Sequence, residues 1–142
     1  MRRVRVLVML VLVGAAIATL IGPMSGAVGF FSRGLSLDVE VKSPATLASR
    51  GAAINVPLNV VCTSRRADLE LDVVQRSGNG IARGFASKDI KCDGDIQQVT
   101  VTVFAFNKAF KKGTAVVDAQ IFGCARICGS EETTAEVAVA RR

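Results

Sequence analysis

The sequence predicts an all-β fold, and three observations lead to this prediction. Apolar residues alternate with a period of two from Leu37 onward, as they do in strands that bury one face. Turns rich in glycine and polar residues separate these runs, which recur at short intervals along the chain. No window repeats its apolar residues at the helical period. Seven short runs at this spacing are typical of an immunoglobulin-like Greek-key β-sandwich, which is the architecture that we expect.

Residues 1–27 have the features of a signal peptide. Arg2, Arg3 and Arg5 form a basic segment, residues 6–21 are apolar, and small residues precede a cleavage site after Ala27. The alternative is an uncut membrane anchor, but the 16 residues of the apolar run fall short of the about 20 that span a bilayer. We therefore expect cleavage, a short leader over residues 28–36 and one β-sandwich domain over residues 37–142.

The predicted strands follow one another through this domain. They cover residues 37–42, 54–62, 69–74, 81–87, 99–106, 114–122 and 134–140, and the run at 81–87 fits the pattern least well. Turn residues lie at 77–80, 92–95 and 111–113. Pro57 indicates an edge position or a bulge, because proline cannot donate to a ladder. We expect the seven phenylalanines in the core, with Phe104, Phe106 and Phe110 grouped at the corner between the fifth and sixth strands.

The four cysteines predict two disulfides at one end of the sandwich. Cys62 closes the second strand, Cys92 follows the fourth, Cys124 closes the sixth and Cys128 lies in the next loop. The second and fifth strands are neighbours in a Greek-key sandwich, so we favour Cys62–Cys92, with Cys124–Cys128 as a local clip. A pairing of Cys62 with Cys124 and of Cys92 with Cys128 remains open, because spacing alone does not fix connectivity.

Charge and cysteine content indicate the environment of the protein. Loss of residues 1–27 would leave 15 basic and 12 acidic residues, a net charge of +3 that is too small to predict nucleic-acid binding. An even number of cysteines behind an export signal is typical of oxidising compartments. We expect an extracellular or cell-envelope protein, a monomer that contacts a membrane only through an uncut signal segment.

Most catalytic chemistry is disfavoured by composition. The chain has no histidine, which excludes histidine-based nucleophile systems and histidine-ligated metals. The cysteine spacing of 30, 32 and 4 does not suit a four-cysteine zinc site, and C-x-x-x-C after a strand is not the thioredoxin motif. We therefore expect no cofactor, no metal and no enzymatic activity. A hydrolase that uses two carboxylates stays as an alternative, which requires two acids facing each other across a cleft.

The loops at the cysteine end contain the candidate binding residues. The second-to-third strand loop holds two arginines, the fourth-to-fifth region two lysines, and the clip an arginine and an isoleucine. These residues are Arg65, Arg66, Lys88, Lys91, Arg126 and Ile127. Four aspartates share these loops, so solubilising charge is the simpler interpretation of the lysines and arginines.

Two stretches resemble known exported families. The segment FKKGTAVVDAQIFGC (110–124) resembles the corner of fibronectin- and immunoglobulin-like domains, although valine stands where those domains have an aromatic residue. Together with SPATLASRGAAINVPLNVVC (43–62), it resembles small secreted actinobacterial proteins with no assigned function. A weaker resemblance is to neocarzinostatin-type apoproteins, which are sandwiches with two disulfides, one of them a short clip. Their ligand-lining residues have no match in this chain.

These observations together predict a non-enzymatic interaction module, secreted or in the cell envelope. Its partner would be an unknown protein or envelope component that binds the disulfide-stapled loop end. One alternative is a carrier that holds an apolar small molecule in a cleft beside the Cys124–Cys128 clip.

Overall fold

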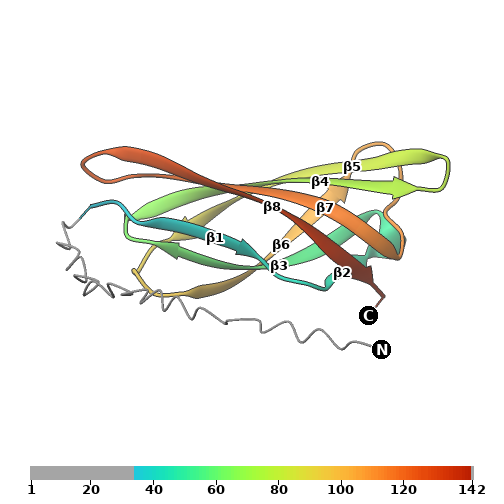
Figure 1. Cartoon of the computed structure of the whole chain (residues 1–142), viewed down its shortest axis with the longest axis horizontal. Coiled ribbons are helices and arrows are strands. Elements are labelled where there is room, and N and C mark those ends of the chain that lie inside the picture. Colours follow the sequence, from blue (N-terminus) through green and yellow to red (C-terminus); the bar gives the residue numbers. More distant parts are fainter. Residues whose placement is uncertain (1–33, 142) are drawn as a thin grey trace, which may run out of the picture. The chain divides into compact units, whose positions relative to one another are not determined.

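The computed structural model describes residues 34–141, which form an all-β unit. The predicted signal peptide and residues 28–33 of the leader lie outside this range. This range contains eight strands and one short 3-10 helix, η1, and Figure 1 shows how the strands are arranged. These are β1 (Leu37–Val41), β2 (Ala45–Ala48), η1 (Ser49–Gly51), β3 (Ala53–Cys62), β4 (Arg66–Ser77), β5 (Gly80–Lys91), β6 (Gln97–Ala105), β7 (Gly113–Cys124) and β8 (Cys128–Ala140).

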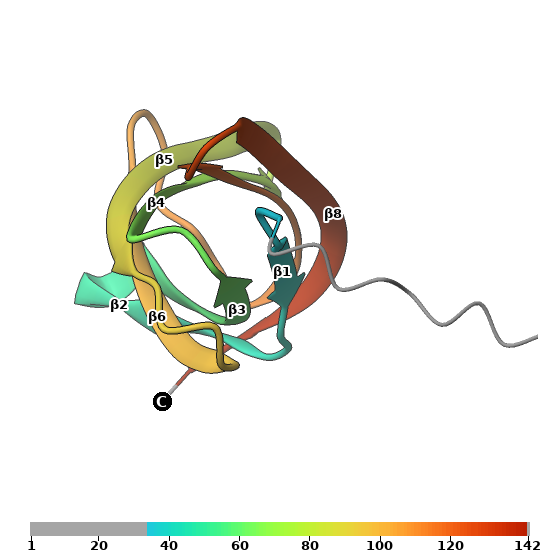
Figure 2. The same cartoon turned by 90° about the vertical axis from the view of Figure 1, so that its left-hand side faces the viewer.

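The predicted immunoglobulin-like sandwich is wrong, because the strands form one sheet that closes on itself. Hydrogen-bonded ladders run in the order β3-β2-β8-β7-β4-β5-β6, and β6 pairs again with β3. The remaining strand, β1, also pairs with β3, on the same edge of β3 as β2 does. Viewed from one end, these strands surround a common interior (Figure 2). The unit is therefore a closed barrel of seven strands with one additional strand.

Two short ladders close the barrel. Strand β5 pairs with β4 along its whole length but with β6 only through Gly84 and Phe85. Strand β2 runs parallel to β8 and pairs with it only through Ala45 and Thr46. A sandwich and a barrel both bury one face of every strand, so both give the same alternation in sequence. Contacts of two residues leave no periodic signal, which is why the sequence did not reveal the closure.

The interior is filled by the inward residues of the alternating runs. In β4, every second residue from Ala67 to Ser77 is buried, while the residues between them are exposed. Burial of each leucine, isoleucine or valine stabilises the fold by roughly 1.5–3 kcal/mol. The largest buried side chains include Ile54, Leu58, Leu69, Leu71, Phe110 and Ile121.

Strand β2 was absent from the sequence prediction, and it explains the position of Pro57. Strands β1 and β2 lie end to end along β3, with a gap at residues 42–44. Pro57 lies opposite this gap, where its carbonyl oxygen accepts a hydrogen bond from the Lys42 N–H at 2.9 Å. The missing proline N–H therefore falls at an interruption of the ladder. Four residues are too few for β2 to show a period.

The connections between successive strands from β2 to β8 lie at the two ends of the barrel. One end, called here the disulfide end, contains the links β3–β4 (63–65), β5–β6 (92–96) and β7–β8 (125–127). The other, called here the hairpin end, contains η1, the β4–β5 turn (78–79), the β6–β7 link (106–112) and Arg141. Figure 1 shows these two groups of connections at opposite ends of the strands.

Candidate functional site

The disulfide end contains both predicted disulfides. Cys62 pairs with Cys92 and Cys124 pairs with Cys128, which confirms the favoured connectivity. The first bond joins the end of β3 to the link after β5, and it is buried on the Cys62 side. The second closes the tight β7–β8 turn, in which the Ala125 N–H donates to the Ile127 carbonyl at 2.9 Å. The turn is therefore held by one covalent bond and one hydrogen bond.

The predicted binding residues are only partly brought together. Arg66 and Lys91 are register partners on β4 and β5, and Arg65 precedes Arg66 in the same exposed region. Arg126 and Ile127 project from the clip, and the Ile127 side chain is 66% exposed. Lys88 is separate from this group, because its ammonium donates to the Thr100 carbonyl of β6 at 3.1 Å. A shallow pocket of about 330 Å³ lies beside the clip, lined by Arg65, Arg66, Asp68, Phe122, Gly123 and Cys124.

Two aspartates near this end have shifted pKa values of opposite sign. A hydrogen bond between the carboxyl groups of Asp68 and Asp89, which are register partners, raises the pKa of Asp68. The backbone N–H of Asp95 donates to the Asp93 carboxylate at 3.0 Å and lowers the pKa of Asp93. Asp93 thus fixes its own loop, whereas Asp68 and Asp89 form a repulsive pair on the outer face.

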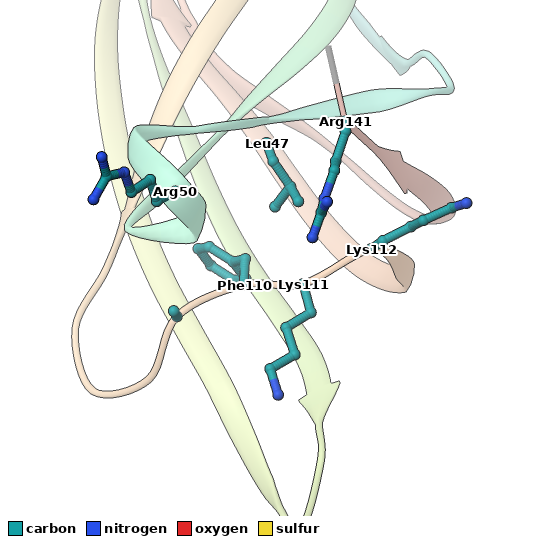
Figure 3. Close-up of a pocket in the computed structure, with 7 residues that line it drawn as sticks. Leu47, Arg50, Phe110, Lys111, Lys112 and Arg141 are labelled. Carbon is teal, nitrogen blue, oxygen red and sulfur yellow. The ribbon is translucent and has the colours of Figure 1, made fainter.

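A larger pocket lies at the hairpin end, where we predicted no site. Its volume is about 750 Å³. Figure 3 shows the side chain of Arg141 beside Leu47, with Phe110 and the backbone of Lys111 and Lys112 below them. The charged ends of Arg50, Lys111 and Lys112 point away from Leu47 and from one another, whereas the guanidinium of Arg141 lies beside Leu47. The lining residues are Leu47, Arg50, Ala109, Phe110, Lys111, Lys112 and Arg141, and we call this site the cationic pocket.

Buried polar groups hold one wall of the cationic pocket in place. The side chain of Gln75 donates to the Lys111 carbonyl and accepts from the Lys111 N–H, both at 2.7 Å. The Ser77 hydroxyl donates to the Ala109 carbonyl at 3.0 Å. Ser64, Gln75 and Ser77 are the buried polar residues of the described chain, so two of these three serve the β6–β7 link. An unpaired polar group at such a position would cost about 1–3 kcal/mol, so these bonds fix the loop.

The four cations of this pocket have no charged partner among residues 34–141. The described part of the chain contains one ion pair, between Lys42 and Glu40 at 2.6 Å. No aspartate or glutamate lines the cationic pocket. Its positive field is therefore not balanced by neighbouring side chains.

Sequence reasoning missed this pocket for a clear reason. Lys111 and Lys112 were interpreted only as turn residues, and Arg50 and Arg141 are far from them in sequence. The pocket forms because η1 contacts the β6–β7 link, where the Phe110 N–H donates to the Gly51 carbonyl at 2.8 Å. The basic pair in the FKKG segment is the one sequence signal that pointed here.

Metal ligation and membrane crossing by a helix have no support in the described structure. Among residues 34–141, no three acidic or cysteine side chains are grouped so that they could hold a metal ion. The same residues include no helix that is long and apolar enough to cross a membrane.

Comparisons with known proteins do not assign a family. The sequence matches no protein-family model, and no curated protein is similar to it. Among solved structures, the sporulation control protein Spo0M from Bacillus subtilis is similar at a TM-score of 0.32, with 15% sequence identity over 76% of this chain. The chain spans 50% of the length of that structure. A likeness at this level carries no information about function.

Proposed function

We propose that this chain is an exported, non-enzymatic interaction module that binds a protein or another envelope component through its disulfide end. The two disulfides support an oxidising environment. Export by the signal segment, cleavage after Ala27 and a monomeric state are parts of the same proposal.

The observation that carries this proposal is the composition of the disulfide end. The exposed Phe122 lines one pocket together with Arg65 and Arg66, and the exposed Ile127 lies in the clip at the same end of the barrel. Arginine beside exposed large apolar side chains is typical of the centre of protein interfaces. The clip holds its turn in one conformation, so little conformational entropy is lost on binding.

The two alternative functions fit this geometry less well. Three of the residues that line the pocket beside the clip are charged, so an apolar small molecule would desolvate charges there. The paired Asp68 and Asp89 are adjacent on one outer surface, whereas glycosidase carboxylates are about 5–9.5 Å apart across a cleft. A protein partner can instead supply groups that complement Arg65 and Arg66.

Site-specific photocrosslinking in cells that export the protein tests the proposal. A benzoylphenylalanine at Ile127 should give a defined crosslinked species, whereas one at Ile81, exposed at the hairpin end, should not. Arg65→Glu with Arg66→Glu should lower the yield by about fivefold or more, because interface anchors contribute more than about 1 kcal/mol. Mass spectrometry of the product also reports whether residues 1–27 are removed.

Matched variants separate a specific interface from a general charge effect. Arg76→Glu with Arg83→Glu changes the same charge on exposed β4 and β5 residues toward the hairpin end and should leave the yield unchanged. Cys124→Ser with Cys128→Ser opens the clip and should lower the yield. Equal crosslinking from positions 81 and 127, or a yield that no variant changes, would contradict the proposal.

A further inference from the structure

We propose that the cationic pocket binds a phosphate ester that carries an apolar group. This site lies at the end of the barrel opposite the disulfides, and it does not depend on the partner proposed above. The inference rests on the charge of the pocket, on its apolar surface and on its fixed wall.

The positive charge of the pocket is complementary to a multivalent anion. Arg50, Lys111, Lys112 and Arg141 surround it, and none of them has an ion-pair partner among the described residues. A phosphate monoester carries about −1.5 to −2 charges near pH 7 and offers three acceptor oxygens. Guanidinium groups match these oxygens with two parallel hydrogen bonds, and ammonium groups add charge at flexible positions. A single carboxylate would neutralise only one of the four positive charges.

The pocket also offers an apolar surface between the cations. Leu47 is partly buried and Phe110 is almost completely buried, and both contribute to the lining. Figure 3 places Leu47 and Phe110 between Arg50 on one side and Lys112 on the other. A ligand that contacts Leu47 and Phe110 therefore has the Arg141 guanidinium beside it, and the side chains of Arg50, Lys111 and Lys112 must turn toward it. This arrangement fits an ester with a hydrocarbon or aromatic group better than it fits inorganic phosphate.

The size of the pocket favours a small molecule over a long polyanion. A volume of about 750 Å³ lies within the range of roughly 300–1,000 Å³ that is usual for ligand sites. The four cations that line this pocket all lie at the hairpin end, so they do not form a stripe along the barrel. A nucleic-acid surface would require such a stripe.

The fixed wall reduces the cost of binding. Gln75 and Ser77 hold the backbone of Lys111 and Ala109 before any ligand arrives. The Phe110 N–H is bonded to Gly51, so η1 and the β6–β7 link are also joined to each other. Only the long basic side chains must become ordered around the ligand, since the backbone is already in place.

A titration followed by nuclear magnetic resonance tests the proposal. The protein is used in the form in which it is recovered after export. The probes are n-hexyl phosphate, inorganic phosphate and 1-hexanol. We expect n-hexyl phosphate to shift the amide signals of Leu47, Phe110 and Lys111, and to bind at least tenfold more tightly than either other probe. Lys111→Gln with Arg141→Gln should weaken this binding at least tenfold. Arg65→Gln with Arg66→Gln, at the disulfide end, should leave it unchanged.

Vesicles distinguish a free ester from a lipid headgroup. Binding of n-hexyl phosphate together with sedimentation on phosphatidic acid vesicles, but not on phosphatidylcholine vesicles, identifies a lipid phosphate as the ligand. Binding of n-hexyl phosphate without vesicle sedimentation identifies a free ester, and either result supports the pocket. The proposal is overturned if n-hexyl phosphate does not bind, if it binds no better than 1-hexanol or inorganic phosphate, or if the Lys111→Gln, Arg141→Gln variant binds it as the wild type does. Thermal unfolding of each variant confirms that it is folded.

Discussion

At the scale of single residues, two exposed carboxylates have opposite effects on stability. The hydrogen bond from Lys42 lowers the pKa of Glu40, while the hydrogen bond with Asp89 raises the pKa of Asp68. A raised pKa in the folded state means that the stabilising contribution is fully present below the unfolded pKa and is lost as pH rises through the folded value. For Glu40 the contribution is present above the unfolded pKa and is lost as pH falls through the folded value.

Asp68→Asn should therefore stabilise the protein at neutral pH, because the amide keeps a hydrogen-bonding group without the charge. The gain should disappear below about pH 3, where the aspartate is itself protonated. Glu40→Gln should have the opposite sign at neutral pH and should also converge with the wild type at low pH. Urea unfolding between pH 2.5 and 7 measures both effects. An offset for Asp68→Asn that does not change with pH would show that the carboxyl pair is not its cause.

The expectation that all phenylalanines are buried is wrong, because it ignored the period-two pattern of the strands. We expected all seven in the core, but Phe104 and Phe106 are 60% and 69% exposed, and Phe85 and Phe122 are also exposed. In the VTVTVFAF segment, Phe104 and Phe106 occupy the same phase as the outward threonines. The period-two pattern therefore predicted their exposure, while residue type alone suggested burial.

At the scale of elements, the contact between η1 and the β6–β7 link shapes the hairpin end. Gly51 has a φ of 92°, in the left-handed region that favours glycine. A Cβ atom at this position would clash with the Phe110 carbonyl oxygen. The close approach permits the hydrogen bond from the Phe110 N–H to Gly51, which brings Leu47 and Arg50 beside Lys111.

Gly51→Ala should destabilise the protein by about 2 kcal/mol more than Gly94→Ala does. Gly94 has a similar φ of 88°, but a Cβ there would meet no atom within 4 Å. Both variants have the left-handed strain of about 1–2 kcal/mol, so their difference isolates the clash. Guanidinium unfolding of the two proteins gives this difference. Equal free energies of unfolding would show that η1 and the link can separate at no cost.

The whole molecule depends on two ladders of two residues each. The β5–β6 ladder passes through Gly84, where a Cβ would clash with the Phe104 carbonyl and lie 2.9 Å from Cγ1 of Val103. The barrel can close here only because residue 84 has no side chain. This dependence makes the closure more sensitive to substitution than the long ladders of β4 with β5 and β7.

Gly84→Ala should cost about 2–3 kcal/mol of stability, because added volume forces β5 away from β6. Amide hydrogen exchange should quicken at Phe85 and Ala105 and stay slow in β4 and β7. Gly129→Ala is the matched control, since its nearest neighbour is the end of the flexible Leu35 side chain at 3.2 Å. It should cost less than about 1 kcal/mol. Equal destabilisation by both substitutions, or faster exchange throughout the barrel, would contradict this account of closure.

Much of the strand pattern could be predicted from the sequence, and the reason is local. Each alternating run reflects one buried face, so each of the seven predicted ranges falls inside an observed strand or extends past it by one residue. Strands β4, β5 and β8 continue three to six residues beyond the predicted ranges. The disulfide pairing was also predictable. Cys62 ends β3, Cys92 lies in the link that leads into β6, and β6 pairs with β3, while Cys124 and Cys128 flank one turn. The weak run at 81–87 lies in the first part of the 12-residue strand β5 (Gly80–Lys91). The last four residues of this strand include three charged side chains, Lys88, Asp89 and Lys91.

The sequence by itself determined an all-β chain and its inward and outward faces, and it favoured the observed pairing of the four cysteines. Only the tertiary structure decided that the strands close into a barrel and that Arg50, Lys111 and Arg141 meet in one pocket. The physical reason is the range of the interactions. Alternation and turns follow from neighbouring residues, whereas closure and pocket depend on backbone contacts such as Gly51 with Phe110 and Gly84 with Ala105, which join segments distant in sequence.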